Sequence, residues 1–244
     1  MHPYCENILK TGVLEAPDGS VIDLNSQISL TEGLFLQQMV EEIKPQVSLE
    51  IGVAFGISSM FICEVLDRID AKKHIAIDLG PIKKPGTDEL DRFGLGLRNL
   101  ERCGYINLVE AYAKPSEIAL PDLLLKGQRL QFAFIDGWHS FDHALVDFFY
   151  VNKMLDVGGI VAFHDAAHPN IRKLLKYIST YPCYRKYGEA KKPEAIFRTK
   201  RKYIEKSIAY VLFWIRQLVP YKPTCVAVQK TAEDQREWTW FRDF

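Results

Sequence analysis

The sequence has no excess of charge of either sign, because 31 lysines and arginines balance 31 aspartates and glutamates in 244 residues. No overall field therefore draws the protein to nucleic acid or to an anionic membrane, and nucleic acid is not an expected partner. Cysteine is also scarce: the five cysteines are scattered and never form a CxxC pair. This distribution argues against a disulfide framework or a zinc knuckle and favours a reducing cytoplasmic location.

Long apolar runs are missing as well. No stretch reaches the roughly 18 uncharged apolar residues that a membrane-spanning helix needs. The first residues, MHPYCENILK, lack the pattern of a secretory signal. What is present is 48% apolar residues, which is enough for one large hydrophobic core, so a single globular domain is expected.

Apolar runs alternate with amphipathic segments, which is typical of an α/β protein with a parallel sheet. The expected strands are 47–52, 74–79, 106–111, 130–136 and 160–165. Helices are expected between them, and an earlier helix over 29–43 has Ser29 and Glu32 in capping-box spacing. The pattern predicts a doubly wound sheet in a main domain over 46–244, with segment 1–45 packed on its core.

Two features at strand ends indicate a nucleoside ligand, because ligands of such sheets bind beyond the carboxyl ends of the strands. In LEIGVAFG, Gly52 and Gly56 let the backbone turn tightly before a helix that offers free N–H groups. Asp78 ends the second strand, where a carboxylate can accept both ribose hydroxyls. The middle glycine of GxGxxG is missing, so a nucleoside without phosphates, such as S-adenosylmethionine, fits better. An ordinary tight turn and a helix cap are the alternatives.

With the motifs LEIGVAFG and FIDGWHSFDHALVDFF, the chain resembles the class I S-adenosylmethionine-dependent methyltransferases, most closely methyltransferase family 24. The resemblance implies a mostly parallel, seven-stranded, Rossmann-like sheet. Many relatives carry Gly-Asp-Ser after the third strand, whereas this chain has Ala111, Tyr112 and Ala113. Adenine is therefore expected to stack on Tyr112 or to form hydrogen bonds with backbone groups. The cofactor-binding residues implied are Glu50, Gly52, Gly56, Ser58, Asp78, Tyr112 and Asp136.

Asp136 and Asp165 end the fourth and fifth strands, which are neighbours about 4.8 Å apart in the sheet of this family. Two carboxylates that face one space favour a divalent cation between them, although helix capping is the alternative. The resemblance to metal-assisted O-methyltransferases implies Asp136, His164 and Asp165 as ligands of Mg²⁺ or Mn²⁺. His164 stands where many relatives have an acid, which favours a softer ion such as Mn²⁺, Fe²⁺ or Zn²⁺.

His139 follows Asp136 by three residues and is expected at the rim of the site. Imidazole titrates near neutral pH and is the usual general base for a hydroxyl group. The resemblance implies that His139 deprotonates the methyl acceptor; capping of the next helix is the alternative. His143 and Asp147 lie one helical turn apart and are predicted to form an exposed pair or to support the site.

The expected function is methyl transfer from S-adenosylmethionine to a hydroxyl oxygen of a small molecule, assisted by a divalent metal. A nicotinamide-dependent oxidoreductase is one alternative, because it would use the same glycine turn and Asp78. A methyltransferase-like binding subunit without catalysis is the other. The acceptor itself is left open among sugars, polyketides, phenols and lipid headgroups.

A helical insertion is expected at about 190–221, before the last strand. It contains the apolar stretch IAYVLFWI, residues 208–215, which must be covered by other protein or by lipid. The favoured interpretation is the interface of a homodimer or higher homo-oligomer. Packing on the protein's own sheet, a lid, and shallow membrane contact through 203–219 are the alternatives.

Overall fold

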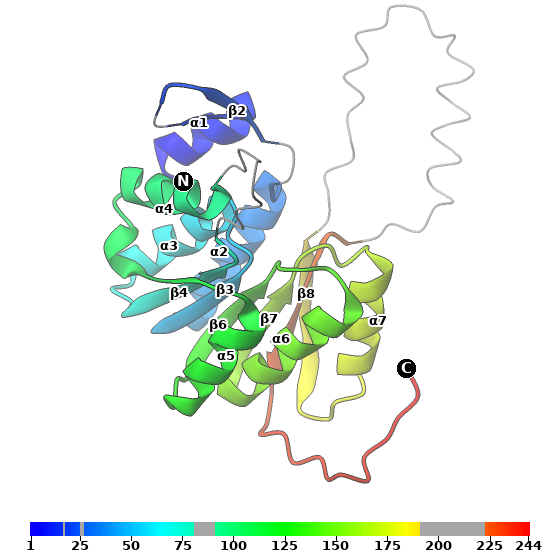
Figure 1. The fold of residues 1–244 in the computed structure, drawn as a ribbon. Coiled ribbons are helices and arrows are strands. Elements are labelled where there is room, and N and C mark those ends of the chain that lie inside the picture. Colours follow the sequence, from blue (N-terminus) through cyan, green and yellow to red (C-terminus); the bar gives the residue numbers. More distant parts are fainter. Residues whose placement is uncertain (17, 25–26, 81–90, 191–222) are drawn as a thin grey trace, which may run out of the picture.

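The computed structural model describes residues 1–16, 18–24, 27–80, 91–190 and 223–244, which are drawn in colour in Figure 1. The strands are β1 Val13–Glu15, β2 Val21–Asp23, β3 Val47–Ile51, β4 Lys73–Asp78, β5 Val109–Ala113, β6 Leu130–Ile135, β7 Leu155–Phe163, β8 Tyr184–Ala190 and β9 Cys225–Lys230. The helices are α1 Pro3–Thr11, α2 Leu30–Ile43, α3 Ile57–Arg68, α4 Arg92–Arg102, α5 Ser116–Leu125, α6 Phe141–Met154 and α7 Pro169–Ile178, with the short 3₁₀ helix η1 Ile106–Leu108.

Seven strands form the main sheet in the order β5-β4-β3-β6-β7-β9-β8. The first five are parallel to one another, and β9 runs antiparallel to both of its neighbours. The chain winds outward in one direction from β3 through β4 and β5, and in the other through β6 and β7, so β3 and β6 flank the switch point where ligands bind in such sheets. This arrangement confirms the predicted mostly parallel, doubly wound sheet.

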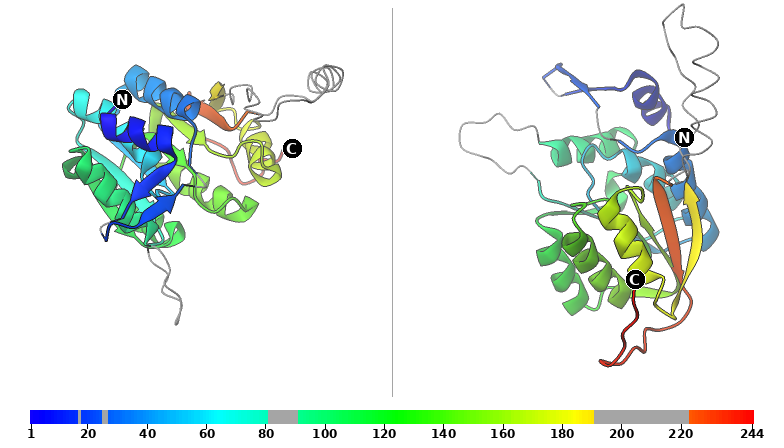
Figure 2. Two further views of the ribbon diagram at one scale, coloured as in Figure 1. Left: turned by 90° about the horizontal axis from the view of Figure 1, so that it is seen from above. Right: turned by 90° about the vertical axis from the view of Figure 1, so that its right-hand side faces the viewer.

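Helices cover both faces of the sheet, as Figures 1 and 2 show. Side chains alternate between the faces along each strand: Phe132 and Phe134 of β6 pack into the cluster that contains the buried faces of α2 and α3. Ala133 and Ile135, between and after them, pack into the cluster formed with α5, α6 and α7. Burial on both sides explains why the central strands read as continuous apolar runs rather than as alternating ones.

Two details of the expected elements differ from the structure. The third strand begins at Val109, because residues 106–108 form η1 and the N–H of Leu108 donates to the carbonyl of Tyr105. The fifth strand, expected from residue 160, begins at Leu155 directly after α6 ends at Met154, so Gly158 and Gly159 lie within β7.

The helix over 92–102 forms despite its two internal glycines, and Gly96 has a packing role. A Cβ added at Gly96 would lie 2.5 Å from the carbonyl oxygen of Ala54 and 3.0 Å from the backbone nitrogen of Gly56. The glycine therefore lets α4 approach the turn between β3 and α3 more closely than any side chain would permit. Gly56 is constrained from the same side, since its own added Cβ would meet Gly96.

The N-terminal segment packs on this same side of the molecule. The α1 residues Cys5 and Ile8 are buried in the α2 and α3 cluster, and the Tyr4 hydroxyl donates to Asn99 of α4. The hairpin β1-β2 follows α1 and was not predicted, because its strands are short and largely exposed. The predicted helix over 29–43 is present as α2, and both hydrogen bonds of its capping box between Ser29 and Glu32 are formed.

The expected helical insertion lies between β8 and β9, and its residues 191–221 fall outside the described part of the chain. Their predicted roles in oligomerisation and membrane contact therefore stay predictions. In the part of the chain that the structure describes, each helix is too short or too polar to cross a bilayer.

The close approach of β3 and β6 at the switch point predicts a strong effect of Gly52→Ala. Gly52 has φ +86°, and an added Cβ would lie 2.1 Å from the carbonyl oxygen of Asp136. Left-handed strain and overpacking together should cost about 2–5 kcal/mol in urea unfolding. Gly127→Ala is the control, since Gly127 has φ +71° and, among the described residues, no atom lies within 4 Å of the added Cβ. Equal losses in both variants would contradict the close approach.

Candidate active site

A cavity of 880 Å³ lies at the carboxyl edge of the sheet, where the ends of β3, β4, β6 and β7 meet the N-terminus of α2. The predicted site residues that line it are Gly52, Ser58, Asp78, Asp136, His139, His164 and Asp165. Glu50, Gly56 and Tyr112 do not line it. Its size is in the range of sites for small molecules and cofactors.

Asp78 fixes the turn between β3 and α3 from the end of β4. Its Oδ2 accepts hydrogen bonds from the backbone N–H groups of Val53 and Ala54, each at 2.8 Å. Ala54 has φ +46°, so the carboxylate holds a turn that includes a non-glycine residue in the left-handed region. Asp78 is thus both a support of the turn and part of the cavity wall.

Glu50 lies below the cavity in a buried polar network. Its carboxylate accepts hydrogen bonds from the hydroxyls of Ser58 and Ser59 and lies 3.1 Å from Nε2 of His74. The other ring nitrogen of His74 is 2.8 Å from the hydroxyl of Ser48. The contacts tie the first turn of α3 to β3 and β4, so Glu50 positions the turn from beneath instead of facing the cavity.

Tyr112 is also turned away from the cavity. Its hydroxyl donates to Glu110 on the same strand, and the ammonium groups of Lys114 and Lys126 lie 5.7 and 6.0 Å from the centre of its ring. The expected stacking of Tyr112 on adenine has no support in this arrangement.

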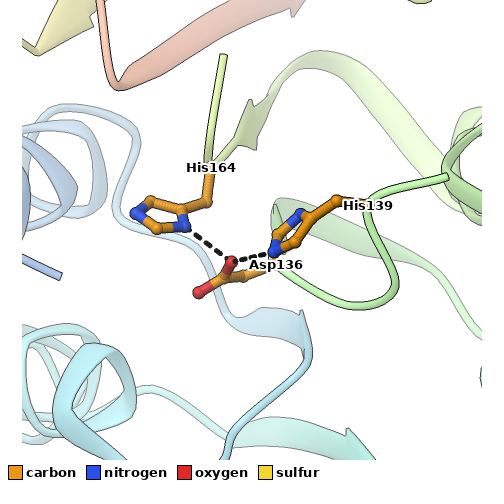
Figure 3. A group of neighbouring side chains, drawn as sticks. All are labelled: Asp136, His139 and His164. Atoms are coloured by element: carbon orange, nitrogen blue, oxygen red, sulfur yellow. Dashed lines mark hydrogen bonds and ion pairs between the residues drawn. The ribbon is translucent and has the colours of Figure 1, made fainter. Parts of the chain in front are cut away.

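Three side chains converge beside the turn, as Figure 3 shows: Asp136, His139 and His164. Because Ile135 pairs with Phe163 in the parallel register, the next residues, Asp136 and His164, are neighbours at the sheet edge. Nδ1 of His164 lies 2.7 Å from Oδ1 of Asp136, and Nε2 of His139 lies 3.8 Å from the same oxygen. One donor atom from each residue falls within 4.8 Å of the others.

Asp165 stands at the edge of this group. Its Oδ2 lies 3.4 Å from Nε2 of His139, and its side chain is half exposed. The sequence predicted that Asp165 and Asp136 face one space, with His139 at the rim. Both acids line the cavity, but the donor atom that lies close to those of Asp136 and His164 comes from His139 and not from Asp165. The register sets His164 rather than Asp165 beside Asp136, and the turn after β6 brings His139 back toward Asp136.

Glu32 of α2 is a residue of this site that the sequence did not reveal. Its Oε1 lies 3.3 Å from Nε2 of His164, and Glu32 is only 2% exposed. Burial raises the pKa of Glu32, but the neighbouring donors of His164, Thr224 and Ser29 outweigh it and lower the pKa to about 2. Its spacing from Ser29 signalled a helix cap, and a cap residue gives no sign that it also reaches a distant strand end.

His164 carries a strongly shifted pKa between these two acids. Burial lowers the pKa of the imidazole, but the hydrogen bonds and charges of Asp136 and Glu32 outweigh it and raise the pKa to about 10. Burial raises the pKa of the Asp136 carboxyl, and this effect is larger than the lowering of that pKa by the hydrogen bond with His164. The group therefore already stabilises one positive charge between two carboxylates, which is the electrostatic setting of a cation site.

The predicted exposed pair of His143 and Asp147 is wrong for Asp147, which is 1% exposed. His143 faces Ser140 instead, with 2.8 Å between Nδ1 and the hydroxyl. Burial raises the pKa of Asp147 to about 6, although a hydrogen bond from Ser116 opposes the shift. Oδ2 of Asp147 lies 3.6 Å from a Cβ built on Gly137, so this acid lies behind the strand-end turn of β6.

The central part of the chain matches a known family. Residues 49–166 match a family model described as a methyltransferase domain. No curated protein matches the sequence. Residues 49–166 are therefore similar to a methyltransferase domain, and the chain has a Rossmann-like fold, in agreement with the resemblance of its motifs.

Solved structures resemble the chain over most of its length. An O-methyltransferase from Bacillus cereus in complex with SAH has 16% sequence identity and a TM-score of 0.63, over 93% of this chain and 90% of that one. The methyltransferase PaMTH1 from Podospora anserina, bound to SAH, has 12% sequence identity and a TM-score of 0.64, over 95% of this chain and 89% of that one. The O-methyltransferase TomG from Streptomyces achromogenes, in complex with SAM, has 16% sequence identity and a TM-score of 0.61, over 84% of this chain and 82% of that one.

Asp147→Asn should stabilise the protein in a pH-dependent way. A raised folded pKa favours the neutral acid, so the penalty for ionising Asp147 is absent below its ordinary pKa of 3.8 and complete above about pH 6. The neutral amide should therefore gain up to about 3 kcal/mol over wild type at pH 8, and this gain should shrink toward pH 4.5 in urea unfolding. Asp142→Asn, at an exposed acid whose pKa is lowered, should show no such gain. A gain in Asp147→Asn that is independent of pH would contradict the assignment.

Proposed function

We propose that the protein transfers a methyl group from S-adenosylmethionine to a hydroxyl oxygen of a small molecule with the help of a divalent metal ion. The observation that carries the proposal is the position of Asp136, His139 and His164 in the same cavity as the turn held by Asp78. The methyltransferase family match favours this function over a nicotinamide-dependent oxidoreductase. The printed descriptions of the similar structures, which name SAM, SAH and O-methyltransferases, support the choice of cofactor and of acceptor atom.

The residues present fit S-adenosylmethionine. Gly52 gives the strand-end turn a backbone surface with no side chain. Gly56 is the N-cap of α3, and no side chain among the described residues caps this helix, which leaves its first N–H groups for a ligand. Asp78 lies in the cavity wall, where its carboxylate would accept ribose hydroxyls. When bound, the cofactor would supply a methyl group on a positively charged sulfur, and an attack on the methyl carbon by an acceptor oxygen, in line with the carbon–sulfur bond, would release the sulfur as a neutral thioether.

The donor set fits a divalent transition metal. Asp136 offers a carboxylate oxygen and His164 an imidazole nitrogen, and a nitrogen of His139 lies within 4.8 Å of both. A carboxylate with an imidazole as ligands suits Mn²⁺, Fe²⁺ or Zn²⁺ better than Mg²⁺, which prefers oxygen ligands, and leaves His139 beside the ion. When bound, the ion would lower the pKa of an acceptor hydroxyl and orient it.

His139 is proposed as the general base. Its side chain is 35% exposed, so its Nε2 can reach an acceptor in the cavity and take the hydroxyl proton. The carboxylate of Asp165, 3.4 Å away, stabilises the imidazolium that forms. The chain's remaining task is alignment of the two reactants, which the fixed turn and the strand ends supply.

Asp78→Ala tests the cofactor assignment. Loss of the ribose contact and of the acceptor for Val53 and Ala54 should weaken S-adenosylmethionine binding by about 1–3 kcal/mol in calorimetry. Asp156→Ala removes a carboxylate near the start of β7, away from the cavity, and should bind as wild type does. Undiminished binding by Asp78→Ala would remove Asp78 from the site.

Turnover tests the metal and the base separately. Transfer of radiolabelled methyl to small molecules in extracts should stop with chelator and return with Mn²⁺. His139→Ala should lower the rate by about 10²–10⁴ while Mn²⁺ affinity stays within about threefold of wild type. If His139→Ala loses Mn²⁺ affinity instead, His139 is a ligand and not the base. Full activity in chelator would rule out the metal, and tight cofactor binding without turnover over all extracts would favour a non-catalytic subunit.

A further inference from the structure

Glu32 is a carboxylate whose two oxygens face different parts of the molecule. Oε2 accepts the backbone N–H and the hydroxyl of Ser29, both at 2.7 Å, as the acid of the α2 capping box. Oε1 lies 3.3 Å from Nε2 of His164 and, within the described residues, accepts no hydrogen bond of regular geometry. A cap residue would ordinarily leave such an oxygen in water, but Glu32 is buried in the wall of the cavity.

The two nitrogens of His164 are directed at different groups. Figure 3 shows Nδ1 directed at Asp136, inside the donor group, while the other ring nitrogen points away from it. That second nitrogen, Nε2, is the one that meets Glu32. A neutral imidazole has one N–H and one lone pair, so the partner of Nε2 decides whether Nδ1 is free to bind a metal ion.

We infer that Glu32 is the positioning residue of the metal site: it keeps a proton of His164 on Nε2, so that a metal ion would take the place of the other ring proton, on Nδ1 beside Asp136. This inference rests on the proposed metal-assisted function. A metal-binding histidine commonly donates its other N–H to a carboxylate, which fixes the ring and strengthens the ligand. Here that carboxylate comes from a helix outside the matched segment 49–166, and the capping box of α2 holds it in place.

The arrangement also accounts for the burial of Glu32. A carboxylate removed from water is costly unless it is paired and hydrogen-bonded. Ser29 satisfies one oxygen of Glu32, and His164 supplies the charge-compensating donor for the other. Helix capping alone requires only the first contact, because Oε1 takes no part in it.

Glu32→Gln and Ser29→Ala separate the two roles of this side chain. If the amide nitrogen introduced by Glu32→Gln faces Nε2 of His164, the imidazole proton must move to Nδ1; if the amide turns round, the N–H of Ser29 loses its acceptor. Mn²⁺ and Co²⁺ affinities of Glu32→Gln, measured by calorimetry on metal-stripped protein, should fall by about 10–100-fold. Ser29→Ala should lower the unfolding midpoint by about 2–4 °C, while its metal affinity stays within about threefold of wild type.

A His164→Asn background is the second control. Glu32 acts through His164, so adding Glu32→Gln to His164→Asn should change Mn²⁺ affinity by less than about threefold. Equal affinity of Glu32→Gln and wild type, or the same loss in both backgrounds, would overturn the inference and leave the proposed function intact. If wild-type protein binds neither Mn²⁺ nor Co²⁺, the proposed metal site and the role of Glu32 are both wrong.

Discussion

The parallel register between β6 and β7 is the constraint on which the site depends. Ile135 pairs with Phe163, and the N–H of His164 donates to the carbonyl of Ile135, so Asp136 and His164 emerge side by side. On the other side of β6, the N–H of Asp136 donates to the carbonyl of Ile51, so the end of β6 is also fixed to the end of β3. A slip of one residue would send the side chain of Asp136 or of His164 to the other face of the sheet and dissolve the group.

Buried polar contacts from the neighbouring strand β4 and the helices α2 and α3 fix the backbone at this edge of the sheet. Glu50 links the first turn of α3 to His74 of β4, and Asp78 holds the turn itself through two backbone N–H groups. Glu32 reaches the group from α2. Each of these acids has hydrogen-bond donors around it, so the cavity wall is organised before any ligand enters. Such preorganisation raises the reaction rate of a site that aligns two reactants, as the proposed function requires.

Much of this follows from local sequence. The strands at 47–51 and 130–135 show as apolar runs, α2 shows through its capping box, and the strand-end acids Asp78 and Asp136 follow from the topology. What the sequence does not reveal depends on contacts between distant residues. Glu50 was expected to bind the cofactor, but its carboxylate contacts His74 and Ser59. The need for glycine at position 96 comes from the Ala54 carbonyl, which packs against α4 from a distant part of the sequence. The exchange of Asp165 for His139 in the donor group likewise depends on the local path of the turn after β6, which periodicity does not encode.

In the proposed function, one edge of the sheet holds both the cofactor and a metal ion. A crystal structure of the protein with SAH and Mn²⁺, with data collected at the manganese absorption edge, tests this proposal most directly. We expect one anomalous peak at about 2.2 Å from a carboxylate oxygen of Asp136 and from Nδ1 of His164, with the ribose of SAH at Asp78. An anomalous peak elsewhere, or no peak beside a bound SAH, would contradict it.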